Sequence, residues 1–241
     1  MKVKITLSYD GSAFMGSQIQ KSTDNTVMGH FQETLSKLGI TDTAIASGRT
    51  DRDVHATAQV LHVSLPHYWS DLKKLKNILN HKLTSSLHVR YIQKVDDDFH
   101  ARYSAKRRVY RYIISTKEKN PFEYPYICFL KELDFKKIKS AIRLFEGTHN
   151  FEYFMKKGSD TENFHRQIYR AYAYRHKDKI ILYFEANGYL RSQIRLMVGF
   201  LLGISDGKAD EKQLIAQLNT EAQFLRKLAP PQGLYLAKVK Y

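Results

Sequence analysis

The chain opens with an alternation of apolar and polar residues that is typical of a strand. Val3, Ile5 and Leu7 would share one face, and the alternation stops at the turn-forming pair Asp10-Gly11. The period then changes to that of a helix, which Gly39 would end. The apolar positions of this predicted helix are Val27, Met28, Phe31, Leu35 and Leu38.

The next sixty residues predict a second strand–helix–strand series. A short strand near residues 44–45 leads into a polar loop, and a longer strand follows over residues 57–65. Ser70 can cap a helix whose apolar positions are Leu72, Leu75, Ile78 and Leu79. A further alternating strand begins at Leu87. The predicted order is therefore strand, helix, strand, strand, helix, strand.

The second half predicts the same plan in longer form. A strand over residues 108–114 precedes a helix that Asp134 would cap and Gly147 would end. Residues 167–176 and 179–186 form a predicted hairpin through Lys177-Asp178. Helices over residues 190–204 and 210–218 and a strand over residues 234–239 complete the series.

These patterns predict an α+β protein of two split βαβ halves, similar to ferredoxin and to RNA-recognition modules. We expect the halves to be residues 1–100 and 101–241, with residues 96–105 as the linker. Each half would have an antiparallel sheet with helices on one face. The exposed faces of the two sheets would flank a basic cleft.

Composition favours a nucleic acid as the partner. The chain has 39 Lys and Arg residues against 24 Asp and Glu, a net charge of +15, and it is rich in Tyr and Phe. Cations suit phosphate contacts and aromatic rings suit base stacking, although a basic surface can also serve solubility alone. Cys128 is the only cysteine, so neither an intrachain disulfide nor a thiolate zinc cluster can form. With no long apolar run and no signal-peptide pattern, we expect a cytoplasmic protein that does not enter a membrane.

The loop over residues 47–56 carries the strongest chemical signal. It places Asp51 between Arg49 and Arg52, and an acid among arginines stays ionised as a candidate nucleophile or charge partner. If the segment were extended, Arg49, Asp51, Asp53 and His55 would share a face. Asp51 and Asp53 could instead be turn formers. A metal site is less favoured, because two carboxylates beside two arginines suit a hard divalent cation poorly.

A second signal is a basic stretch in which cations and aromatic rings alternate. It could bind RNA, with the alternative that its tyrosines are core residues and its arginines are solvated. The candidate RNA-binding cations in it are Arg102, Lys106, Arg107, Arg108 and Arg111. Further along, Arg191 and Arg195 are four residues apart and would lie on one face of an otherwise apolar helix, where each needs an anion.

Taken in order along the chain, these motifs resemble the tRNA pseudouridine synthase A family. The resemblance covers nearly the whole chain and is specific because the motifs are correctly ordered and spaced. The matching segments are residues 9–11 (YDG), 48–51 (GRTD), 54–56 (VHA), 98–105 (DFHARYSA), 110–113 (YRYI), the helix with Arg195, Ala229-Pro230 and residues 233–236 (GLYL).

The resemblance implies the pseudouridine synthase fold and an isomerase that converts uridine to pseudouridine at positions 38, 39 and 40 of the tRNA anticodon stem-loop. It implies a homodimer, no metal and no organic cofactor. By position, Asp51 matches the catalytic aspartate and Tyr110 the tyrosine that stacks on the base. Arg195 matches the basic residue of the active site, and Arg49 matches the arginine that helps to extrude the nucleotide.

The chemistry fits these roles but leaves the route open. A uridine in a stem must be flipped out, and Tyr110 could then stack on it. Asp51 could attack the sugar, attack the base, or assist proton abstraction from the ribose. The rival functions are an RNA-binding or tRNA-folding protein with weak or no activity on the same fold, and a metal-dependent nuclease.

Two positions depart from the family pattern. Ser17 stands where many relatives have tryptophan, so we expect the loss of a packing contact near the first loop. Asp53 stands where glycine is usual; aspartate tolerates unusual backbone angles less well than glycine, and its charge would raise the pKa of Asp51 unless Arg52 compensates.

Overall fold

The computed structural model describes residues 1–158 and 161–241 and divides the chain into two units. The first unit contains residues 1–106 together with 235–241, and the second contains residues 107–234. The expected halves, residues 1–100 and 101–241, stay a prediction; in this division residues 101–106 and the last strand are grouped with the first unit. Within the described ranges, no helix is long and apolar enough to cross a membrane.

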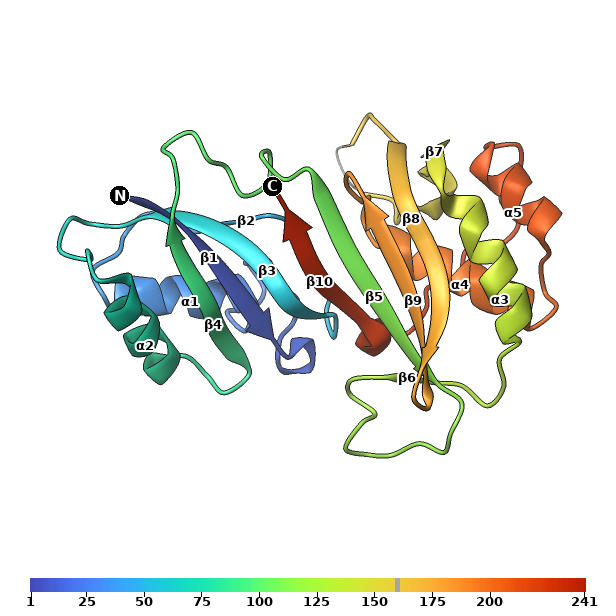
Figure 1. The fold of residues 1–241 in the computed structure, drawn as a ribbon, viewed down its shortest axis with the longest axis horizontal. Helices are drawn as coiled ribbons and strands as arrows, with labels where there is room; N and C mark the ends of the chain where they lie inside the picture. Colours follow the sequence, from blue (N-terminus) through green and yellow to red (C-terminus); the bar gives the residue numbers. More distant parts are fainter. Residues whose placement is uncertain (159–160) are drawn as a thin grey trace. The chain divides into compact units, whose positions relative to one another are not determined.

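The first unit has the expected split βαβ order (Figure 1). Its elements are β1 (Lys2–Tyr9), α1 (Val27–Ser36), β2 (Ile45–Ala46), β3 (His55–Ser64), α2 (Leu72–Lys82), β4 (Leu87–Lys94) and, at the end of the chain, β10 (Leu234–Lys240). β1 pairs antiparallel with both β4 and β3, and β2 pairs antiparallel with the far edge of β3. The strands β1 and β2 therefore run parallel with β3 between them, as the predicted motif requires.

The hydrophobic pattern of this unit is realised as predicted. Val3, Ile5 and Leu7 are fully buried along one face of β1, and Phe31 and Leu35 of α1 are fully buried as well. Figure 1 shows α1 behind the strands and α2 beside β4. The predicted cap of α2 was wrong by one residue: the carboxylate of Asp71, rather than Ser70, accepts a hydrogen bond from the backbone of Lys74 at 2.9 Å.

The last strand is placed by pairing with a strand far away in sequence. β10 runs parallel to β3, with Tyr235 opposite His55 and Leu236 opposite Ala56. At the other end of β10, Tyr241 donates a hydrogen bond to the carbonyl of Ala101 at 2.8 Å. The segment that we expected to be a linker is thus fastened to the first unit.

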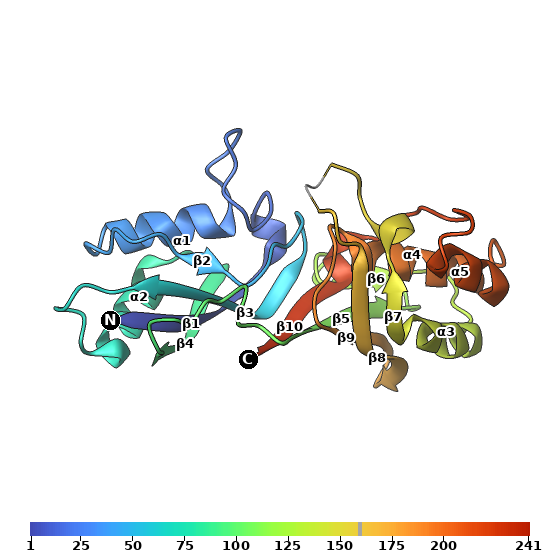
Figure 2. The same ribbon diagram turned by 90° about the horizontal axis from the view of Figure 1, so that it is seen from above.

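The second unit has an antiparallel sheet in the order β5-β9-β8-β7, with the short β6 parallel to β5. Figure 2 shows α3, α4 and α5 grouped together in this unit. Its elements are β5 (Arg107–Ser115), β6 (Cys128–Phe129), α3 (Phe135–Ala141), β7 (Gly147–Asn150), β8 (His165–His176), β9 (Lys179–Ala186), α4 (Gln193–Ser205) and α5 (Glu211–Leu218). Both units are thus α+β with mainly antiparallel sheets, as expected, but β9 lies between β5 and β8, so the second sheet does not repeat the strand order of the first.

Two helices of this unit differ from the prediction. The helix that begins after Asp134 turns into a 3₁₀ helix at Ile142–Phe145, and Gly147 begins β7 rather than ending a helix. The helix with Arg195 begins at Gln193, because Ser192 has a left-handed backbone with φ of 56°. Arg191 therefore lies before the helix, and its predicted place on one helical face with Arg195 was wrong.

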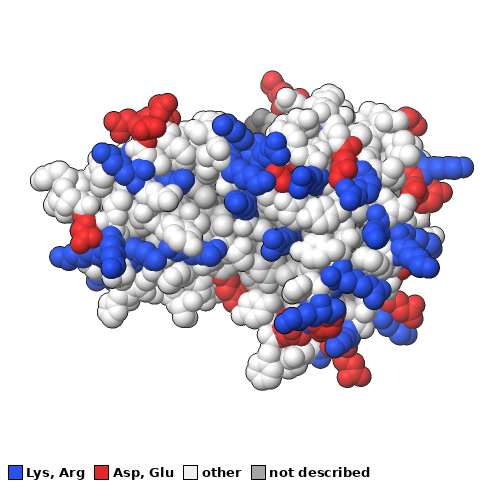
Figure 3. Space-filling view, viewed as in Figure 1, with Lys and Arg blue, Asp and Glu red and all other residues white. Residues whose placement is uncertain are grey.

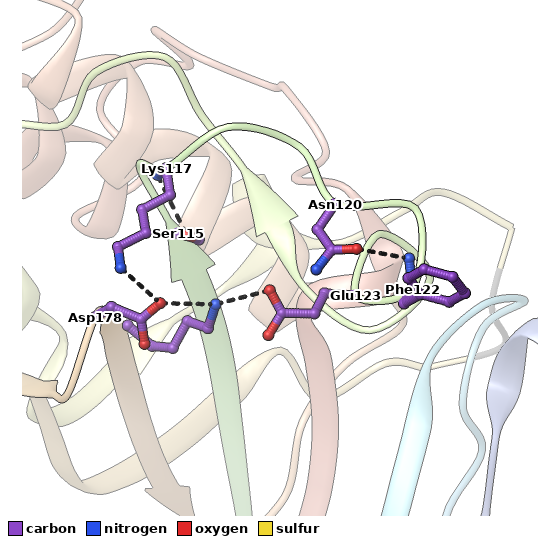
Figure 4. A network of polar contacts seen from close by, with 7 residues as sticks. Ser115, Lys117, Asn120, Phe122, Glu123 and Asp178 are labelled. Atoms are coloured by element: carbon purple, nitrogen blue, oxygen red, sulfur yellow. Dashed lines mark hydrogen bonds and ion pairs between the residues drawn. The ribbon is translucent and has the colours of Figure 1, made fainter.

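The loop between β5 and β6 is fastened to the β8–β9 turn by charged side chains (Figure 4). The Nζ atom of Lys179 lies 3.2 Å from the carboxylate of Asp178 and 3.1 Å from that of Glu123. The Nζ atom of Lys117 lies 3.5 Å from the carboxylate of Asp178. Ser115, at the end of β5, is buried, and its hydroxyl accepts a hydrogen bond from the backbone of Lys117 at 3.3 Å. These contacts connect the loop to the hairpin that pairs with β5.

Helix α4 packs against a later segment of the chain at two glycines. A Cβ atom at Gly199 would overlap the backbone carbonyl of Lys227, whereas one at Gly203 would meet only the end of the Leu225 side chain. The close approach at Gly199 lets the backbone of Ala229 donate a hydrogen bond to the carbonyl of Arg195 at 2.9 Å. Gly199 is therefore required for this packing, and Gly203 much less so.

We predict that Gly199→Ala destabilises the protein by about 1–3 kcal/mol, even though alanine favours a helix, because a backbone carbonyl cannot move aside as a side chain can. Gly203→Ala is the matched control on the same helix and should cost clearly less, because Leu225 can change rotamer. Urea unfolding followed by circular dichroism measures both. A Gly199→Ala protein as stable as the control would contradict the prediction.

Candidate active site

Asp51 lies in a turn, not in an extended segment. The backbone of Val54 donates to the carbonyl of Asp51 at 3.2 Å, and β3 begins only at His55. Asp51 is half-buried and Arg49 is exposed, whereas His55 is buried. The four alternating side chains of this segment thus do not share one face, because the turn interrupts the alternation.

Thr50, the residue before Asp51, is held by buried hydrogen bonds with Ser17 and Tyr9. Its backbone N–H donates to the Ser17 hydroxyl at 2.8 Å, and its carbonyl accepts from the Ser17 backbone at 3.1 Å. Its hydroxyl lies 2.8 Å from that of Tyr9 on β1. Burial raises the pKa of Tyr9 to about 12, so the phenol stays protonated and can donate at neutral pH.

The beginning of the loop is held to β3 by one buried amide. Gln59 accepts a hydrogen bond from the Ser47 hydroxyl at 2.8 Å and donates to the carbonyl of Gly48 at 2.8 Å. The backbone of Ser47 also donates to the carbonyl of Val60 at 2.7 Å. These bonds fix the beginning of the loop, at Ser47 and Gly48, against strand β3.

His55, at the other end of the loop, is a structural residue in the first unit. Its Nδ1 accepts a hydrogen bond from the backbone of Gly11 at 3.0 Å, and its ring stacks on Tyr235 at a centroid distance of 4.7 Å. Gly11 is needed here because a Cβ atom would overlap the carbonyl of Val54. The first loop of the chain thus packs directly on the end of the Asp51 turn.

Asp53 adopts the left-handed backbone that makes glycine favourable, with φ of 62°. Its carboxylate lies 3.7 Å from Nε of Arg52, and both side chains are substantially solvated. The neighbouring arginine therefore faces the extra negative charge, as the sequence suggested.

Tyr110 and Tyr112 lie on the same face of β5. Tyr110 is 8% exposed, and its ring contacts that of Tyr189 edge to face, with centroids 5.3 Å apart. Tyr112 is fully buried and donates a hydrogen bond to the carbonyl of Pro230 at 2.8 Å.

Arg195 of α4 lies against this same face of β5. Its Nε donates to the carbonyl of Ala229 at 2.9 Å, next to the Pro230 carbonyl that Tyr112 binds. Burial raises the pKa of Tyr112 well above its usual value, and the Arg195 charge acts in the opposite direction, as expected for two close groups. The second unit thus brings together Arg195, Tyr112 and Ala229-Pro230, with Tyr110 two residues along the same strand face.

The candidate RNA-binding cations are distributed over both faces of β5 and beyond it. Arg107 forms an ion pair with buried Glu185 at 3.1 Å and lies over the ring of Tyr169, which gives it a structural role. Arg108 shares the Tyr110 face by alternation and donates to the carbonyl of Asn187 at 2.9 Å, whereas Arg111 is exposed on the opposite face. Arg102 and Lys106 are exposed in the first unit.

Arg191 is exposed and donates to the carbonyls of Gly158 and Lys157 at 3.1 and 3.4 Å.

Among the residues that the structure describes, His, Cys, Asp and Glu side chains form no group of three or more that could hold a metal ion.

Sequence reasoning missed the polar residues behind the Asp51 loop. Ser17 was expected to mark a lost packing contact, yet its side chain is buried and bonded to Thr50. Tyr9 was noted only as part of the YDG motif, and Gln59 only as one position of the strand expected over residues 57–65. Gln59 offered a weak signal, because it is a polar residue at a position of β3 that alternation assigns to the core face.

Comparison with known proteins shows which family the chain belongs to. A family model described as tRNA pseudouridine synthase matches residues 5–104 and 141–241. Proteins named tRNA pseudouridine synthase A are similar to the chain: the one from Campylobacter jejuni serotype O:6 is 40% identical over 241 residues, covering 100% of both chains. The one from Wolinella succinogenes is 40% identical over 98% of this chain and 92% of its own, and the one from a Geobacillus species is 37% identical over 100% and 98%.

Among solved structures, a chain of the "Crystal Structure of a Cbf5-Nop10-Gar1 Complex" aligns with 97% of this chain and 48% of its own, with a TM-score of 0.40 and 10% identity, a similarity too weak to bear on function. The family match and the full-length relatives establish the family of the chain without this solved structure. The chain belongs to the tRNA pseudouridine synthase family and is an isomerase that acts on tRNA.

Proposed function

We propose that the chain isomerises uridine at positions 38, 39 and 40 of the tRNA anticodon stem-loop, with the Asp51 carboxylate as the nucleophile and Tyr110, Arg195 and Arg49 as substrate-binding residues. The family shows the conversion of uridine to pseudouridine in tRNA. The observation that carries the assignment of Asp51 is its place in a turn whose preceding residue is fixed by buried hydrogen bonds with Ser17 and Tyr9. A fixed carboxylate that is still half-solvated suits attack on a bound substrate.

The reaction is an isomerisation, so its atoms balance within the substrate. The bond between ribose C1′ and uracil N1 breaks, a bond between C1′ and uracil C5 forms, C5 loses a proton and N1 gains one. A base inside a stem must first leave the helix, and an aromatic ring can replace the lost stacking. Tyr110 is suited to this role because its ring is already supported by Tyr189.

The surface supports a polyanionic substrate. Lys and Arg side chains are spread over the face drawn in Figure 3, with fewer Asp and Glu side chains among them. The net charge of +15 favours association with RNA through phosphate contacts. A homodimer stays a prediction from the resemblance, and a cytoplasmic location stays a prediction from the sequence pattern.

We expect the wild-type protein to release tritium from an unmodified tRNA transcript labelled at uracil C5, with EDTA present. Asp51→Asn keeps the size of the side chain and removes its charge, so it should lower the rate by on the order of a thousandfold or more. Replacing the uridines at positions 38, 39 and 40 one at a time should remove the corresponding release. Full activity of Asp51→Asn, or release that needs a divalent cation, would refute the assignment.

Asp53→Gly should leave activity equal or higher, because glycine adopts φ of 62° without a steric penalty. Stability should be unchanged or higher by up to roughly 1 kcal/mol. Asp53→Asn separates the two effects, since it removes the charge and keeps the tolerance of a left-handed backbone. The tritium assay and thermal unfolding measure these changes, and a loss of more than about tenfold with glycine would show that Asp53 has a role of its own.

The Tyr189 hydroxyl is buried and makes no hydrogen bond within the part of the chain that the structure describes. Tyr189→Phe should therefore keep activity and raise the stability by about 1 kcal/mol, because an unsatisfied polar group is removed. Tyr189→Ala removes the ring beside Tyr110 and should lower activity by roughly tenfold or more. Equal activity of both variants in the tritium assay would contradict the prediction that the Tyr189 ring supports Tyr110 in the reaction.

A further inference from the structure

Five buried polar side chains lie in the Asp51 loop or behind it, each at most 8% exposed: Tyr9, Ser17, Ser47, Thr50 and Gln59. The hydroxyls of Thr50 and Ser17 and the amide of Gln59 all interact with the Tyr9 hydroxyl. Buried polar groups are costly unless they bond to one another, so such a cluster specifies one arrangement. The cluster ends at Thr50, whose next neighbour is the proposed nucleophile.

Ser17 satisfies both backbone groups of Thr50. Its hydroxyl accepts from the Thr50 N–H at 2.8 Å and donates to the Thr50 carbonyl at 3.3 Å, and its own N–H donates to that carbonyl at 3.1 Å. Thr50 belongs to neither a helix nor a strand, so it has no ladder of hydrogen bonds to fix its backbone. Because Ser17 makes these bonds, it constrains the torsions that aim the Asp51 side chain.

Ser17 is itself held by the beginning of α1. The backbone of Met28 donates to the Ser17 carbonyl at 3.0 Å, and that of Val27 donates to the Gly16 carbonyl at 3.2 Å. These are N–H groups of the first turn of α1, which lack partners inside the helix. A continuous series of bonds therefore leads from a rigid helix through Ser17 to Thr50.

We propose that Ser17 is a positioning residue for the isomerisation, which holds the Asp51 carboxylate in its reactive orientation by fixing the backbone of Thr50. This inference rests on the proposed role of Asp51. Removing the hydroxyl leaves the bond from the Ser17 N–H to Thr50 in place, so the loop stays attached. It leaves the buried N–H of Thr50 without its acceptor, so the residue before Asp51 becomes free to move.

The test compares Ser17→Ala with Ser115→Ala, which removes an equally buried serine hydroxyl in the second unit. We expect Ser17→Ala to lower kcat by about tenfold with KM for the tRNA transcript little changed, because a misaligned nucleophile slows chemistry more than binding. Ser115→Ala should keep kcat. A Ser17→Ala protein with wild-type kcat, or one that loses only KM, would overturn the proposal.

Amide hydrogen exchange gives a readout that does not depend on activity. In Ser17→Ala the peptide that covers residues 47–54 should exchange at least about tenfold faster, with α1 and β3 unchanged. Unchanged exchange in that peptide would overturn the proposal whatever the activity, whereas a fully active Asp51→Asn protein would instead refute the assignment of Asp51. Tyr9→Phe removes the other contact to Thr50, so its effect on kcat should combine non-additively with that of Ser17→Ala.

Discussion

The arrangement around Asp51 depends on how a loop without regular structure is kept in one conformation. Strands and helices satisfy their backbone groups internally, but the Asp51 turn must obtain its partners from elsewhere. Gln59 on β3 and Ser17 next to α1 bond to its backbone groups, and Tyr9 on β1 contacts the side-chain hydroxyl of Thr50. Because these elements are themselves packed on one core, the turn inherits their rigidity while Asp51 stays half-solvated.

The second unit uses a different device for Arg195. Here two backbone segments approach closely, because Gly199 lets the segment before Ala229 lie directly on α4. Arg195 and Ala229 then exchange two hydrogen bonds. Tyr112 binds the next carbonyl, at Pro230. A flexible, charged side chain is thereby fixed at its Nε on the strand face that also carries Tyr110, and this fixed position favours the proposed role of Arg195 in substrate binding.

Much of the fold could be predicted because local periodicity decides local structure. The strand at Val3–Leu7, the helix that ends before Gly39 and the hairpin through Lys177-Asp178 all follow from residue spacing and turn chemistry. The errors occurred where two local signals competed. Both Ser70 and Asp71 can cap α2. The apolar pattern predicts that α4 begins at residue 190, but the left-handed backbone of Ser192 delays its start to Gln193, so Arg191 lies outside the helix.

By itself, the sequence determined the order of most elements, the family motifs and the candidate residues Asp51, Tyr110 and Arg195, because these depend on neighbours within a few positions. Only the tertiary structure decided which distant partners meet. Ser17 bonds to Thr50 across 33 positions, Arg107 pairs with Glu185 across 78, and β10 joins β3 in the first unit. No local pattern encodes such pairs, because they form only when the packing of the whole core brings two buried polar groups or two strand edges to the same place.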